Sequence, residues 1–130
     1  VALSNLSDAC AEQGAQSERR RKAARACIER CVALAQATRP AGLDVERASH
    51  GLWLSHLDLI LGARDRLEED PAPELHRSIS GALARASLAD PTRHAPSYPG
   101  LAFRWPADQA ATLAALARYD RAATEVCGCG

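Results

Sequence analysis

His56 and Asp58 stand out in the sequence because both lie in an otherwise apolar helical segment. At helical spacing, the neighbours of His56 are Leu52, Leu59, Ile60 and Ala63. A desolvated imidazole can titrate near neutrality, so His56 is a candidate acid/base or polarising group in a cavity. The alternative is a core histidine that makes one hydrogen bond.

Asp58 places a charge in a nearly all-apolar helix. It points about 160° away from His56 at 100° per residue, so the two cannot form a dyad on one helix. A buried carboxylate must be paired, hydrogen-bonded or face a wet cavity. We therefore predict Asp58 as a polar contact of a bound molecule, or as a satisfied internal group.

A second candidate site is the segment SYPGLAFRWPADQ, which holds three of the five aromatic side chains in the chain. Tyr98, Phe103 and Trp105 are predicted to wall a pocket for substrate. Asp108 lies in the first turn of the helix that follows. There it either complements the helix dipole or supplies the catalytic carboxylate at the mouth of the pocket.

The remaining histidines carry weaker signals. His50 lies six positions before His56, which is the wrong spacing for a shared metal ion. His76 and His94 are predicted to be ordinary surface residues.

Five cysteines leave at least one thiol unpaired if disulfides form. Cys27 and Cys31, at i and i+4, are read as two small buried side chains rather than a metal half-site or a redox pair. Cys127 and Cys129 form a C-x-C tail, for which terminal fraying is favoured over binding of a soft metal. With no Gly-rich phosphate loop either, the sequence predicts no metal and no cofactor.

The elements that would position these residues are four helices, over about 8–38, 44–69, 74–88 and 106–123. Within the first, a break is expected near Gly14 and Ser17 is a plausible N-cap. Pro106 suits the first position of the last helix. Antiparallel helical hairpins follow from these lengths.

The helix over 44–69 is predicted to be central, because it is apolar on most faces. One narrow stripe of this helix carries small or polar side chains in place of large apolar ones, and its small residues would let another backbone approach closely. The stripe consists of Gly51, Ser55, Asp58, Gly62 and Asp65. The inward face of the helix over 74–88 is predicted to hold Leu75, Ile79, Ala82, Leu83 and Ala86. In the last helix the predicted inward residues are Leu113, Leu116 and Ala117.

Composition supports one all-α domain of 130 residues, with 47 % hydrophobic residues dominated by Ala and Leu. Sixteen basic residues balance sixteen acidic ones, so no nucleic-acid partner is expected. The basic cluster Arg19–Lys22 is read as a solvated helix face rather than a phosphate contact. No apolar run approaches the length of a membrane span.

The order of SHLDLILGARDRL, a short amphipathic helix, a Pro- and aromatic-bearing loop and WPADQAATLAALARYD resembles consecutive helices of an (α/α) toroid. In particular, residues 46–120 resemble bacterial relatives of linalool dehydratase/isomerase. Those enzymes have a comparable Gly-His-Leu-Asn-Leu helix and a later helix that ends in a Tyr-Asp pair.

The resemblance implies that His56 lines an active site, with Asp58 at the position of the family's Asn. The two cysteines of the family fall near Pro99 and on Asp108, so neither thiol is present here. A toroid needs about twelve helices, so the resemblance also implies that this chain is a fragment of a larger protein or completes a barrel by association.

Two functions follow. The first is part of a lyase/isomerase-like enzyme that acts on a small apolar substrate, with His56 and Asp108 as catalytic groups. The second is a non-catalytic helical module that buries its apolar faces against a partner or a second copy.

Overall fold

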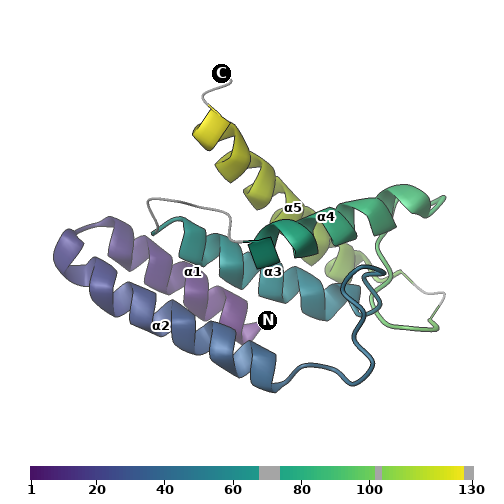
Figure 1. The fold of residues 1–130 in the computed structure, drawn as a ribbon, viewed down its shortest axis with the longest axis horizontal. Helices are drawn as coiled ribbons and strands as arrows, with labels where there is room; N and C mark the ends of the chain where they lie inside the picture. Colours follow the sequence, from purple (N-terminus) through teal and green to yellow (C-terminus); the bar gives the residue numbers. More distant parts are fainter. Residues whose placement is uncertain (68–73, 102–103, 128–130) are drawn as a thin grey trace.

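The computed structural model describes residues 1–67, 74–101 and 104–127, and these form five α-helices and no strand. The helices are α1 (Ala2–Ala15), α2 (Glu18–Ala37), α3 (Gly51–Asp65), α4 (Glu74–Ala89) and α5 (Pro106–Cys127) (Figure 1). The all-α fold class predicted from composition is confirmed. No helix within the described ranges is long and apolar enough to cross a membrane.

The segment predicted as one helix over about 8–38 forms two antiparallel helices, and the first of them begins at residue 2 (Figure 1). The predicted break near Gly14 is confirmed, and Ser17 caps α2 by accepting a hydrogen bond from the Arg20 backbone N–H at 3.4 Å. Gly14 allows α1 and α2 to approach, since a Cβ there would lie 2.7 Å from the Ala24 Cβ.

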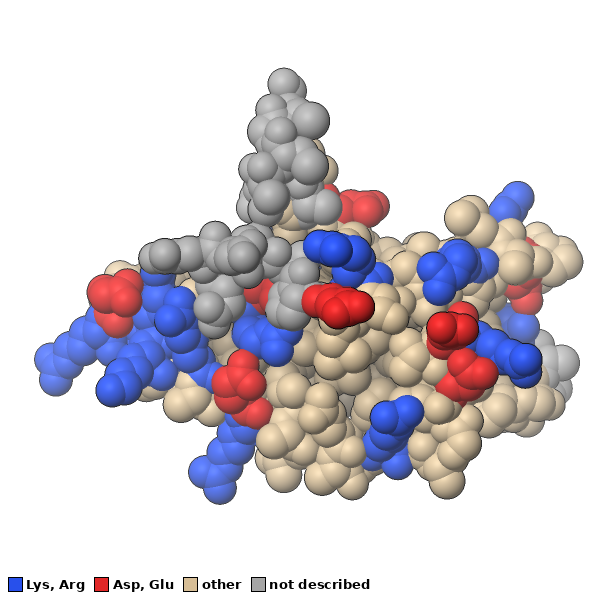
Figure 2. Space-filling model, viewed as in Figure 1, with Lys and Arg blue, Asp and Glu red and all other residues tan. Residues whose placement is uncertain are grey.

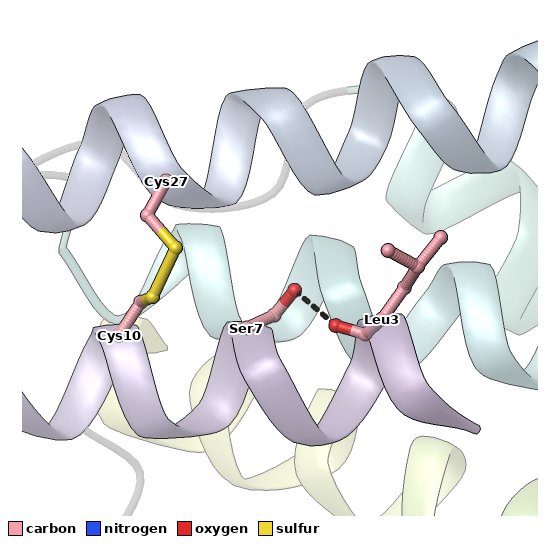
Figure 3. The surroundings of a disulfide bond; sticks show 4 residues. All are labelled: Leu3, Ser7, Cys10 and Cys27. Atoms are coloured by element: carbon pink, nitrogen blue, oxygen red, sulfur yellow. Dashed lines mark hydrogen bonds between the residues drawn. A yellow bond between two sulfur atoms is a disulfide. The ribbon is translucent and has the colours of Figure 1, made fainter.

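A disulfide between Cys10 and Cys27 joins α1 to α2 (Figure 3). One turn before Cys10, the Ser7 hydroxyl donates to the Leu3 carbonyl at 2.8 Å. The prediction that Cys27 is a free buried side chain is wrong, because packing α1 against α2 places Cys10 beside it. The same prediction for Cys31 is confirmed, since this thiol is free and 2 % exposed.

Helix α3 is the centre of the fold and packs against all four other helices. Its side chains Leu54, Ile60 and Leu61 are almost completely buried, as the all-round apolar pattern predicts. The predicted start near residue 44 is wrong. Residues 45–50 form turns, and Ala48 has a left-handed backbone (φ 48°), which an α-helix cannot contain.

The loop before α5 holds the start of α3 in place. The Gly51 N–H donates to the Pro96 carbonyl at 2.9 Å, and the Leu52 N–H donates to the Ser97 carbonyl at 3.3 Å. These are N–H groups that a helix N-terminus leaves without internal partners. A Cβ at Gly51 would lie 2.3 Å from the Pro96 oxygen, so the contact requires glycine.

The inward faces of α4 and α5 differ in part from the prediction. The buried residues of α4 include Ile79, Ala82 and Leu83 as expected, whereas Leu75 is 39 % exposed. In α5, Leu113 is 64 % exposed and Ala117 is exposed too. Helix α5 instead turns Thr112 inward, where its hydroxyl lies 2.8 Å from that of Ser55 on α3. The inward face of α5 therefore includes a buried polar contact, which the apolar periodicity of the sequence does not predict.

Basic and acidic side chains are mixed over most of the face seen in Figure 2. Basic groups gather at the end where α1 turns into α2, the region of the Arg19–Lys22 cluster (Figure 2). There Arg20 donates to the Gln16 side-chain oxygen at 2.6 Å, and Arg21 lies 3.4 Å from Glu18. The cluster is thus engaged in local helix-surface contacts.

Candidate functional site

A cavity of about 470 Å³ lies among the start of α1, the end of α2, the first half of α3 and the loop that precedes α5. We call it the His56 cavity. Most of its wall is apolar, and it includes Leu3, Ala35, Leu52, Trp53, Leu57 and Ile60. Its polar side chains are Ser4, Thr38, His50, His56, Ser97 and Tyr98. An apolar pocket with a few convergent polar groups is the usual form of a small-molecule site.

His56 is half-buried in this cavity, and its Nδ1 lies 3.1 Å from the Ser4 hydroxyl oxygen. Burial lowers the pKa of His56 below its ordinary value of 6.5. The Asp108 carboxylate acts in the opposite direction and raises it. The neutral imidazole is therefore the main form at pH 7, as a general base requires.

Asp108 lies in the first turn of α5 and is partly buried. Its Oδ2 atom is enclosed and has no hydrogen-bond partner among the described residues. The Asp108 charge raises the pKa of His56, so it favours the protonated imidazole. Asp108 does not line the His56 cavity, so of the two residues predicted as catalytic only His56 lies in its wall.

The residues predicted to bind substrate separate into three places. Tyr98 lines the His56 cavity while remaining 44 % exposed. Trp105 is 57 % exposed and is not part of the cavity wall, so the structure gives no support to the prediction that it walls this pocket. Phe103 lies outside the described residues. Asp58 is 1 % exposed and faces α4 instead of the cavity.

Asp58 belongs to a buried polar cluster between α3 and α4, and its partners explain why a charge is tolerated there. The Ser80 hydroxyl donates to both Asp58 carboxylate oxygens, at 2.8 and 3.0 Å. His76 Nδ1 lies 2.6 Å from Asp65 Oδ2, and its Nε2 lies 3.5 Å from Asp58 Oδ1. Burial raises the pKa of Asp58 to about 6, although the His76 charge and the Ser80 hydrogen bond lower it. The expectation that Asp58 must be hydrogen-bonded or paired is confirmed.

The prediction that His76 is a surface residue is wrong, because this side chain is 1 % exposed. Its ring packs edge-on against the Tyr119 ring at 5.1 Å. His76 faces α3 because both carboxylates of the stripe, Asp58 and Asp65, require a partner from another helix. His76 shares a helix face with the inward residues Ile79 and Ser80, at i+3 and i+4, and this spacing could have predicted its burial.

Sequence reasoning also missed Ser4 and gave His50 no role in a cavity. Both contribute polar atoms to the cavity wall. Ser4 and His56 are separated by 52 positions in the sequence, so no local pattern connects them.

The described residues contain no group of three or more His, Cys, Asp or Glu side chains that could hold a metal ion. The side chain of Cys127 and residues 128–130, which contain the C-x-C tail, lie outside the described part of the chain.

The chain matches no protein-family model, no curated protein and no solved structure.

Proposed function

We propose that this chain binds a small, largely apolar molecule in the His56 cavity and performs acid/base chemistry on it. The observation that carries the proposal is the half-buried His56 in an apolar cavity of about 470 Å³. His56 would act as the base, and Asp108 would stabilise the imidazolium that forms when it takes a proton. Tyr98 would contact the ligand.

This chemistry is of the lyase/isomerase type, since removal of a proton from carbon begins both elimination and isomerisation. We include in the proposal a relationship to (α/α) toroid proteins, supported by the all-helical fold and by the sequence resemblance of residues 46–120 to linalool dehydratase/isomerase relatives. In that arrangement, further helices would complete the wall around the cavity.

Binding of the neutral fluorescent probe N-phenyl-1-naphthylamine tests the cavity. Ala2 is exposed and lines the cavity, so Ala2→Trp adds bulk there without disturbing the core. Ala9 is exposed on the same helix but is not part of the cavity wall, which makes Ala9→Trp the matched control. We expect saturable binding by the wild type and Ala9→Trp, and loss of binding by Ala2→Trp. Absence of saturable binding by the wild type would reject the proposal.

A second candidate function, a helical interaction module, is favoured by the apolar side chains at one end of the molecule. Arg104 Nη2 donates to Asp90 Oδ2 at 2.8 Å, which ties the segment before α5 to the end of α4. The end of α4 and the segment before α5 carry three exposed apolar side chains, Leu88, Leu101 and Trp105, which are 66 %, 48 % and 57 % exposed. Sedimentation velocity across a concentration series tests this function. Self-association that is weakened by Leu88→Glu would support it, and a monomer at all concentrations would count against self-association.

A further inference from the structure

The His56 cavity contains a second imidazole, that of His50. Each of the two rings is held through its Nδ1 atom by a serine hydroxyl. The partners of those two serines differ, and they assign a different proton position to each ring.

The hydrogen bonds of Ser4 give His56 its tautomer. The single Ser4 hydroxyl proton is donated to the Val1 carbonyl at 2.8 Å, because a carbonyl oxygen can only accept. The Ser4 oxygen must then accept from His56 Nδ1, 3.1 Å away, so this nitrogen carries the proton. The Nε2 atom of His56 is left as an acceptor for a ligand or a proton.

The hydrogen bonds of Ser49 give His50 the opposite tautomer. The Asp44 backbone N–H can only donate, and it donates to the Ser49 hydroxyl oxygen at 2.9 Å. The acceptor that the described residues offer to the Ser49 proton is His50 Nδ1, at 3.0 Å. In the neutral His50 ring the proton therefore lies on Nε2, which becomes a donor.

We propose that the ligand of the His56 cavity carries a carbonyl group, with His50 Nε2–H donating to its oxygen and His56 Nε2 receiving a proton from the adjacent carbon. The inference rests on the proposed function and names its ligand class and a second functional residue. An apolar wall with one donor and one acceptor matches a small ketone or enone, which has an apolar body, an acceptor oxygen and an acidic C–H.

The step is balanced without any co-reactant. The C–H proton moves to His56 Nε2, and the C–H electron pair forms a carbon–carbon double bond while the carbonyl pair moves to oxygen. The enolate oxygen accepts the hydrogen bond of His50, and the negative charge of Asp108 favours the imidazolium form of His56. Return of the proton to the same carbon, or to another carbon of an enone, completes exchange or isomerisation.

Long-range ¹H–¹⁵N NMR of the histidine side chains tests the tautomers without a ligand. We expect the wild-type protein, at a pH where both rings are neutral, to show the Nδ1–H form for His56 and the Nε2–H form for His50. Ser4→Ala should release His56 from the Nδ1–H form. Observation of the Nε2–H form for His56 in the wild type would overturn the proposal.

Exchange of the α-protons of cyclohexanone in D₂O, followed by ¹H NMR, tests the reaction. We expect the wild type to exceed free imidazole at equal concentration, and His56→Ala and His50→Ala each to lose on the order of a hundredfold. His94→Ala, which changes an imidazole outside the cavity, is the control and should retain the wild-type rate.

Wild-type exchange no faster than that of free imidazole, or unchanged exchange in His50→Ala, would overturn the carbonyl assignment. If N-phenyl-1-naphthylamine still binds the wild type and not Ala2→Trp, the cavity remains a binding site for apolar molecules and only the carbonyl inference fails. If the probe does not bind either, the proposed function fails with it.

Discussion

Replacing Asp58 with Asn should change how the stability of the protein depends on pH, because the Asp58 carboxyl is one of the most deeply buried titratable groups described. Burial raises its pKa from 3.8 to about 6, against the opposing effects of His76 and Ser80. The folded protein therefore holds the Asp58 proton more tightly than the unfolded chain does. Between these two pH values the folded state binds more protons, so the Asp58 contribution to the free energy of unfolding falls as pH rises.

The size of the effect follows from the change in pKa. Each pH unit corresponds to about 1.4 kcal/mol, so a rise from 3.8 to about 6 corresponds to roughly 3 kcal/mol. The contribution is fully present below the unfolded-state pKa and is lost as pH rises through about 6. An asparagine keeps the side-chain shape and an acceptor for Ser80, but it does not ionise.

The assay is urea unfolding, followed by circular dichroism, of wild type and Asp58→Asn from about pH 4 to about pH 8. At about pH 4 the unfolded-state carboxyl is already partly ionised, so across this pH range we expect the stability difference to move by roughly 2.5 kcal/mol in favour of Asp58→Asn toward the alkaline end. Asp120→Asn removes an exposed carboxylate and is the matched control, with a profile parallel to wild type. Parallel profiles for wild type and Asp58→Asn, or a shift of opposite sign, would refute the reasoning.

Three further outcomes are expected. Cys10→Ser should lower the free energy of unfolding, measured by urea unfolding, by roughly 3 kcal/mol, because the disulfide is lost. A reductant should lower the stability of the wild type by a similar amount and leave that of the variant unchanged. Gly51→Ala should lower the melting temperature, because its Cβ would lie 2.3 Å from a loop carbonyl oxygen, whereas Gly81→Ala, which meets only an arginine side-chain end at 3.2 Å, should preserve or raise it. The NMR titration midpoint of His56 should lie below 6.5, and Asp108→Asn should lower it further by removing the charge that raises it; a midpoint that rises in this variant would contradict the electrostatic assignment.

The starts of two helices and the central position of a third could be predicted from the sequence. The start of α2 at Ser17 and the start of α5 at Pro106 follow from side chains that satisfy or suit a helix N-terminus. The central position of α3 follows from apolar residues on nearly all its faces. These signals act between residues within about one turn, which is why they can be read without knowing the fold.

The start of α3 could not be predicted in this way. Residues 44–50 can be written as helix, but Ala48 adopts a left-handed backbone and the first N–H groups of α3 bind carbonyls of the Pro96–Ser97 loop. Those carbonyls are more than forty positions away in the sequence, so the helix propensity of residues 44–50 cannot predict these hydrogen bonds.

For the candidate site, the sequence by itself determined that His56 lies in an apolar setting and that Asp58 needs a polar partner. Only the tertiary structure decided that Ser4 contacts His56, that the Asp108 charge acts on His56, and that His76 is the buried partner of Asp58 and Asp65. It also joined Cys10 to Cys27. The physical reason is that the residue type shows whether a buried side chain needs a polar partner. Which residue supplies that partner depends on how helices distant in the sequence pack together.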